Sequence, residues 1–365
     1  MTETAAVPFG KSADFIVRSA EPFNAEPPPG LLGRSALTPH AAFYVRNHGR
    51  VPELDAVGHR VVVDGLVERS LELSVADLRS QFTAVEVTAT LQCAGNRRTD
   101  LLALAEIPGE IPWDVGAVGT ARWRGARLAE VLAAAGVAGG AAHVEFLGLD
   151  ETPGDRPGRF GGSVPLAKAL SPEVVLAYEM NGEPLAPVHG APLRALIPGY
   201  VGARSVKWLA RVALGARPST NHFQAKAYKL FGPGVDPASA PPGAGLMLGD
   251  LAVNSAILAP APGAGLEAGR VAVTGWAVAG GRAIARVDVS GDDGASWVPA
   301  ELLEDQGPWA WRMWRAELEL APGEHRLRAR AWDAAAQTQP EEPVTTWNPK
   351  GYANTAQPRV AVRVR

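Results

Sequence analysis

The sequence AVEVTATLQCAGNRRTD, residues 84–100, changes character halfway along. Its first part is rich in β-branched residues and has an apolar side chain at every second position, which predicts a strand over 84–93. Cys93 ends that strand, and a Gly-Asn turn with Arg97 and Arg98 follows. Because nearby cations favour the thiolate, this pattern is typical of a cysteine that acts as a nucleophile or a metal ligand. The alternative is a buried cysteine that only fills the core, which is the commoner fate of a lone cysteine.

The first part of the chain mixes strands and helix in no regular order. Apolar and β-branched runs predict further strands over 59–67, 143–150 and 193–198. Residues 126–136 repeat apolar side chains at helical spacing and end in glycine, which predicts an amphipathic helix with a glycine cap. A parallel α/β fold would alternate strands and helices regularly. We therefore predict an α+β domain over residues 41–230.

Prolines and glycines mark the other segments of the chain. The run PPPG at 27–30 predicts an irregular N-terminal arm over 1–40. A second Pro/Gly-rich run predicts a connection between domains over 231–249. Short strands separated by turn signals such as GDDG and APGE follow it, and they predict an all-β sandwich over 250–365.

Composition and charge exclude several classes of protein. The formal net charge is -3, so no global positive field would draw the chain to nucleic acid or to an anionic membrane surface. The chain has no apolar run long enough to span a bilayer and no signal-peptide pattern at its start, so we expect a cytoplasmic protein. A single cysteine excludes an internal disulfide and a zinc site built from several thiolates.

Three arginines lie near expected strand ends or turns. Arg46 lies in FYVRNH, Arg98 follows Cys93, and Arg194 ends HGAPLR. A guanidinium group is a planar fork that matches two oxygens of an oxyanion. If the three converge, they form an anion site; taken singly, an arginine is more often a solvated surface charge.

Several segments together resemble the sulfite oxidase family of molybdopterin-dependent oxidoreductases, in a haem-free form of bacterial or plant type. The resemblance covers about residue 35 to the C-terminus, with the segments in the family's order. They are LQCAGNRR, IPWDVGAVGTARWRGARL, LAYEMNGEPL, HGAPLRALIPGYVGARSVKWL and WNPKGYANTAQPRV. The resemblance implies a molybdopterin domain followed by an immunoglobulin-like dimerisation domain.

The resemblance also implies roles for individual residues. It implies that Cys93 ligates molybdenum, which suits a soft thiolate. Positions that match the family's pterin and phosphate contacts are Tyr44, Val45, Arg46, Asn47, His48, Asp150, His189, Arg194, Ser205, Val206 and Lys207. Positions that match its substrate pocket are Arg46, Arg98, Trp113, Tyr228 and Lys350. Sulfite oxidases of animal type have arginine at the position of Lys350, so this chain keeps the charge there but loses the fork.

The activity implied is oxidation of sulfite to sulfate at a Cys-ligated molybdenum, with electrons passed to an external acceptor such as a cytochrome or oxygen. A haem domain is not expected, because the arm has neither the length nor the His-Pro-Gly-Gly motif for one. Lys350 leaves another oxyanion reaction at molybdenum open, such as nitrate reduction. The alternatives outside this class are a cofactor-free binding protein and a cysteine hydrolase that uses Cys93 with His189.

The resemblance further implies a homodimer formed through the sandwich. The run WAWRMWR at 309–315 is unusually rich in large apolar side chains. In a strand, Trp309, Trp311 and Met313 would share one face and Trp314 would lie on the other. If the first face packs inside the sandwich, Trp314 points outward, and either a second copy of the chain or a loop or the first domain of the same chain would cover it.

Overall fold

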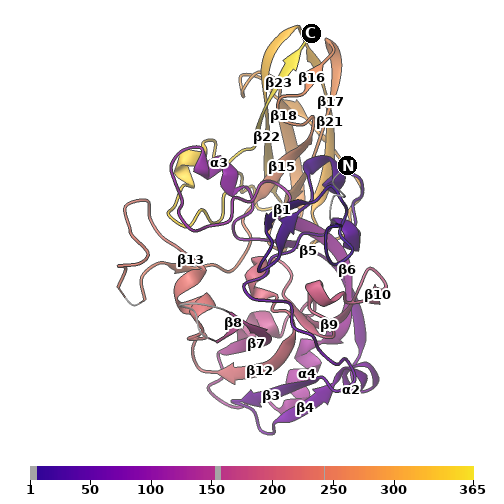
Figure 1. Ribbon diagram of the computed structural model, residues 1–365, viewed down its shortest axis with the longest axis vertical. Helices are drawn as coiled ribbons and strands as arrows, with labels where there is room; N and C mark the ends of the chain where they lie inside the picture. Colours follow the sequence, from indigo (N-terminus) through magenta and orange to yellow (C-terminus); the bar gives the residue numbers. More distant parts are fainter. Residues whose placement is uncertain (1–5, 153–157, 242) are drawn as a thin grey trace.

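The computed structural model describes residues 6–152, 158–241 and 243–365 of the chain. Two structural units lie end to end, with the first at the bottom of Figure 1 and the second, which carries the C-terminus, at the top. No helix within the described ranges is long and apolar enough to cross a membrane.

The first unit contains two five-stranded sheets. One sheet has the order β10-β9-β6-β5, and β11 also pairs with β9. Its strands are β5 (Ala84–Gln92), β6 (Val118–Arg127), β9 (Val175–Met180), β10 (Glu183–Pro184) and β11 (Arg194–Leu196). The other has the order β4-β3-β12-β7-β8, from β3 (Arg60–Gly65), β4 (Leu71–Ser74), β7 (His143–Glu151), β8 (Arg159–Pro165) and β12 (Leu209–Gly215). Only the β3–β12 pair is parallel among these described strands, so the α+β prediction is confirmed.

The first unit also contains short helices. They are α2 (Val75–Gln81), α3 (Arg98–Leu102), α4 (Leu128–Ala135) and α5 (Leu166–Ala169). Of these, α2, α4 and α5 pack against the two sheets, and α3 packs beside the C-terminal segment (Figure 1). The helix predicted at 126–136 is α4, and its apolar residues Leu128, Val131, Leu132 and Ala135 are fully buried. It ends at Gly136, whose φ of 75° suits a residue without Cβ. The strands predicted at 59–67, 84–93, 143–150 and 193–198 are present as β3, β5, β7 and β11.

The sequence predicted an irregular N-terminal arm, but part of the arm has regular secondary structure. It contains β1 (Ile16–Ser19), paired with β2 (Asn24–Glu26), and the short helix α1 (Pro29–Leu32). The backbones of Ala25 and Val45 exchange two hydrogen bonds of 3.0 and 2.8 Å. The buried Glu26 carboxylate accepts hydrogen bonds from the backbone N–H groups of Asp114 and Gly116 at 2.9 and 3.0 Å. These long-range bonds order the arm against the body of the first unit, which local sequence cannot indicate.

The second unit is a sandwich of two sheets, as predicted. One sheet has the order β15-β17-β21-β20, from β15 (Asn254–Ala259), β17 (Gly269–Val278), β20 (Glu301–Leu302) and β21 (Arg312–Leu320). The other has the order β16-β23-β22-β18-β19, from β16 (Gly265–Leu266), β18 (Ile284–Ser290), β19 (Val298–Pro299), β22 (Gly323–Asp333) and β23 (Arg359–Val364). Between the units, β13 (Lys229–Leu230) pairs with β14 (Leu246–Met247) across the Pro/Gly-rich segment.

The orientation expected for Trp314 is wrong. Its side chain is fully buried in the core between the two sandwich sheets. Trp311 and Met313 lie on the opposite face, as expected, but they pack against Leu32 of the arm and Val118 of β6. Alternation along a strand separates two faces without saying which face is inside. Here both faces are buried, because the first unit covers the outer one.

Candidate active site

Cys93 lies where the chain leaves β5. Its backbone N–H donates to the carbonyl oxygen of Ala117 at 2.9 Å, and its own carbonyl oxygen accepts from the N–H of Asn96 at 3.0 Å. The tight turn ends at Arg97, which adopts left-handed backbone angles and starts α3. The thiol is buried, and two of the cavities that it lines contain most of the predicted site residues. Burial raises its pKa, and the nearby cations of Arg46 and Arg98 oppose that rise.

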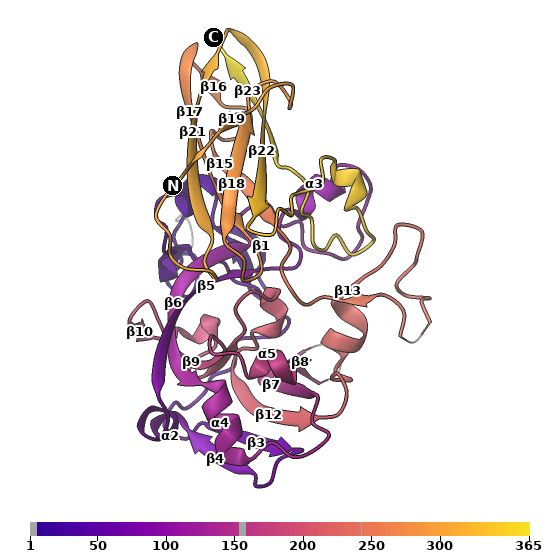
Figure 2. The same ribbon diagram turned by 180° about the vertical axis from the view of Figure 1, so that it is seen from behind.

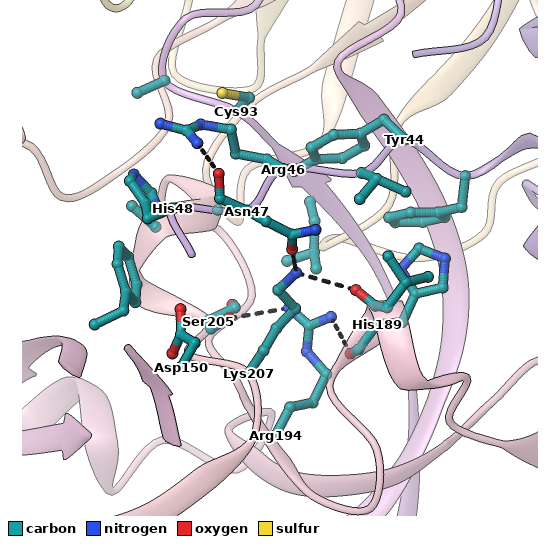
Figure 3. Close-up of a pocket in the computed structure, with 18 of the residues that line it drawn as sticks. Tyr44, Arg46, Asn47, His48, Cys93, Asp150, His189, Arg194, Ser205 and Lys207 are labelled. Atoms are coloured by element: carbon teal, nitrogen blue, oxygen red, sulfur yellow. Dashed lines mark hydrogen bonds between the residues drawn. The ribbon is translucent and has the colours of Figure 1, made fainter. Parts of the chain in front are cut away.

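The first cavity gathers residues from separate parts of the sequence. Figure 3 shows Cys93 at one end, Asp150 and Arg194 toward the other, and Asn47 and Lys207 between them. The lining residues that the sequence predicted are Tyr44, Val45, Arg46, Asn47, His48, Asp150, His189, Arg194, Ser205 and Lys207. Val206 does not line it, because its side chain is fully buried in the hydrophobic core of the first unit.

This cavity holds more positive than negative charge. Lys207 donates to the Asn47 side-chain oxygen and to the Val188 carbonyl oxygen, and burial pulls its pKa well below the ordinary value. Arg194 donates to the carbonyl oxygens of His189 and Ser205 at 2.9 and 3.0 Å, and burial lowers its pKa to about 10. Charged groups held this far from water need a counter-charge.

The described lining of this cavity contains a single acidic residue. Asp150 is the carboxylate among the described lining residues, and burial raises its pKa to about 6. One of its buried oxygens has no hydrogen-bond partner within the described part of the chain. The donor set therefore fits a ligand with a phosphate for Lys207 and Arg194 and a polar group for Asp150.

Lys11 is a member of this cationic group that the sequence did not predict. It comes from the N-terminal arm, and its Nζ lies 2.7 Å from Nε2 of His189. It also donates to the carbonyl oxygen of His40. Burial lowers the pKa of Lys11 to about 7 and that of His189 well below its ordinary value. No local motif marks Lys11, since only the path of the arm brings it to His189, which lines the cavity.

The stability of the cofactor-free protein should depend on Lys11 above pH 7. Between pH 7 and 10.5 the buried amine is neutral in the folded chain and protonated in the unfolded chain, so the free energy of unfolding rises with pH. We expect Lys11→Met to reduce this rise by up to about 1.4 kcal/mol per pH unit. Urea unfolding at pH 7.5, 8.5 and 9.5 measures it, with the exposed Lys226→Met as control. Equal pH dependence in both variants would exclude the effect.

Cys93 also lines a second cavity, whose lining includes all the residues predicted for the substrate pocket. They are Arg46, Arg98, Trp113, Tyr228 and Lys350. The Arg98 guanidinium is oriented by the backbone: its Nε donates to the Lys350 carbonyl oxygen at 3.1 Å and an NH group to that of Ile111 at 2.6 Å. The Tyr228 hydroxyl lies 2.9 Å from Nε2 of His48.

The C-terminal part of the chain helps to close this cavity. In both views of the molecule α3 lies beside the segment that contains Lys350 (Figures 1 and 2). Glu110 and Tyr352 are among the lining residues that were not predicted. Tyr352 stacks on Tyr228 with ring centroids 5.3 Å apart. Its place in WNPKGY, two residues after Lys350, was a signal that could have found it.

Two family models match the chain that forms this site. The model of the oxidoreductase molybdopterin binding domain matches residues 48–223. The model of the Mo-co oxidoreductase dimerisation domain matches residues 246–365. The chain is therefore a molybdenum-cofactor oxidoreductase.

Comparison with individual proteins narrows the class. The chain is 44% identical to sulfite oxidase of Gallus gallus over 93% of its own length and 76% of that protein. It is 40% identical to sulfite oxidase of Arabidopsis thaliana over 95% of its length and 93% of that protein. The sulfane dehydrogenase SoxCD from Paracoccus pantotrophus has a similar structure, with a TM-score of 0.81 over 94% of this chain and 85% of that one, at 25% identity. The chain belongs to the sulfite oxidase family.

Proposed function

We propose that the protein oxidises sulfite to sulfate. Sulfite and water give sulfate, two protons and two electrons, and the electrons pass to an external acceptor. The observation that carries the proposal is the second cavity, where Arg46, Arg98 and Lys350 surround a space that Cys93 also lines. Cations around a small cavity favour an oxyanion, and the thiol would bring the metal to its edge.

The cofactor would be held in the first cavity. Cys93 would be the protein's ligand to molybdenum, and Lys207 and Arg194 would bind the phosphate of the pterin. When bound, the metal supplies the two-electron chemistry. The residues of the chain bind and orient: Arg46 and Arg98 would hold the oxygens of sulfite so that its sulfur faces the metal. Lys350 would add a point charge without the fork of an arginine.

Metal analysis and turnover test this function together. We expect roughly one molybdenum per chain after expression in a host that makes the cofactor. We also expect sulfite-dependent reduction of ferricyanide, and no haem band in the visible spectrum. A chain without molybdenum would favour a cofactor-free binding protein or a cysteine hydrolase. A chain with molybdenum that does not oxidise sulfite would refute the substrate.

Nitrate reduction is the second candidate. The nitrate reductase of Hordeum vulgare is 37% identical over 94% of this chain, although the chain spans only 41% of that protein. Lys350, at the position where animal-type sulfite oxidases have arginine, is the feature that keeps this candidate open. Oxidation of the reduced enzyme by nitrate, faster than sulfite turnover, would favour it.

We also propose a homodimer formed through residues 250–365. The support is the match of residues 246–365 to a dimerisation domain. We expect sedimentation at micromolar concentration to give a mass near twice 38.2 kDa. A mass near that of one chain would refute the dimer.

The cytoplasmic location stays a prediction, which fractionation of the source cells would test.

A further inference from the structure

Glu110 places a negative charge inside the proposed oxyanion site. One of its carboxylate oxygens lies 3.3 Å from an NH2 nitrogen of Arg98, and the other lies 3.1 Å from Nζ of Lys350. The carboxylate is largely buried, with 14% of the side chain exposed, beside an Arg98 side chain that is 2% exposed. Ion pairs so shielded from water are stronger than those on the surface.

Arg98 does not need Glu110 to keep its orientation. Two of its three guanidinium nitrogens donate to backbone carbonyl oxygens, those of Lys350 and Ile111. The third nitrogen is the one that faces Glu110. For Lys350, Glu110 is the hydrogen-bond partner of the ammonium group within the described residues. Glu110 therefore occupies the donors of Arg98 and Lys350 that an incoming anion would use.

The segment that carries Glu110 is irregular but anchored. It runs between α3 and β6, with buried side chains at Ile107 and Trp113 on either side of Glu110. The preceding residue, Gly109, has a φ of 75° and nothing within 4 Å of its Cβ position. Buried side chains thus fix both ends of the segment, so competition with an anion would require only the Glu110 side chain to turn away from the two cations.

We infer that Glu110 is a built-in competitor of the substrate anion. In the free enzyme its carboxylate neutralises Arg98 and Lys350, and a bound oxyanion takes its place, since two anions cannot share the same donors without strong repulsion. The returning carboxylate competes with bound sulfate for the same donors, and this competition speeds the release of sulfate. Glu110 thus weakens anion binding. The inference rests on the proposed function only in taking an oxyanion as the ligand.

Direct binding of inorganic sulfate tests this without turnover. Glu110→Gln keeps the size of the side chain and removes its charge. We expect the dissociation constant for sulfate, measured by calorimetry on the oxidised holoenzyme at low salt, to fall about tenfold. The control is Glu106→Gln, an equal change of net charge at an exposed position of the same segment, for which we expect less than about a twofold change.

The kinetics should separate competition from a structural role. In Glu110→Gln we expect KM for sulfite and the inhibition constant for sulfate to fall together, and kcat to fall as product release slows. Adding Lys350→Met to Glu110→Gln should remove most of the gain in sulfate affinity. Glu110→Ser is a second variant without the charge, and it should also bind sulfate more tightly.

The outcome that overturns the inference is sulfate binding that is unchanged or weaker in both variants with an unaltered thermal midpoint. That result would mean that Glu110 organises the two cations rather than competing for them. Tighter sulfate binding together with an enzyme that does not oxidise sulfite would leave the inference standing and refute the proposed function instead.

Discussion

Cys93→Ser is expected to abolish sulfite oxidation while most of the pterin stays bound. A serine hydroxyl has almost the size of the thiol, so the turn after β5 should keep its shape. The serine hydroxyl ionises far less readily than a thiol. It is also a hard ligand, whereas this site is expected to bind molybdenum through a soft thiolate. The proposed pterin contacts, Lys207 and Arg194 among them, lie elsewhere in the first cavity. We expect activity below about 1% of the wild-type value.

Three measurements check this expectation. Sulfite-dependent reduction of ferricyanide gives the activity, fluorescence of the released pterin gives the cofactor content, and the thermal midpoint reports the fold. Cys93→Ala serves as a second variant that offers no ligand at all. Near-normal activity in the serine variant would refute the assignment of Cys93 as the metal ligand. Loss of the pterin in both variants would mean that Cys93 helps to hold the whole cofactor.

Arg98→Gln is expected to raise KM for sulfite about tenfold to a hundredfold, because a charge-assisted contact of this kind contributes about 1.5–3 kcal/mol. Turnover should fall as well, since the bound anion loses a group that orients its sulfur. Steady-state kinetics with sulfite measure both. Arg98→Lys should have a KM between those of wild type and Arg98→Gln, because lysine restores the charge without the fork.

The neighbouring arginine offers a matched control. Arg97 is as deeply buried as Arg98, but its guanidinium donates to Asn254, to the Ser255 carbonyl oxygen and to that of Ala356, away from the cavities. We expect Arg97→Gln to lower the thermal midpoint and to leave KM within about twofold of wild type. Unchanged kinetics in Arg98→Gln would place Arg98 outside the anion site.

Local patterns in the sequence were enough to predict the main elements. The alternation over 84–93 became β5, and the helical spacing over 126–136 became α4 with Gly136 at its end. Such patterns work because a strand or helix selects side chains by their spacing, which neighbouring residues encode. The arm was harder to predict, because its strands and helix are ordered by contacts with β6 and with the segment that precedes it.

For the site, the motif around Cys93 and the family resemblance identified the cysteine and every charged residue except Glu110 that lines the two cavities in the described part of the chain; their roles stay predictions. What the sequence by itself determined was therefore the elements, the class of fold and the family. Only the tertiary structure decided that Trp314 faces inward, that Lys11 reaches His189, and that Glu110 lies between Arg98 and Lys350. These contacts join residues up to 240 positions apart, and packing of the whole chain, rather than any local spacing, brings such residues together.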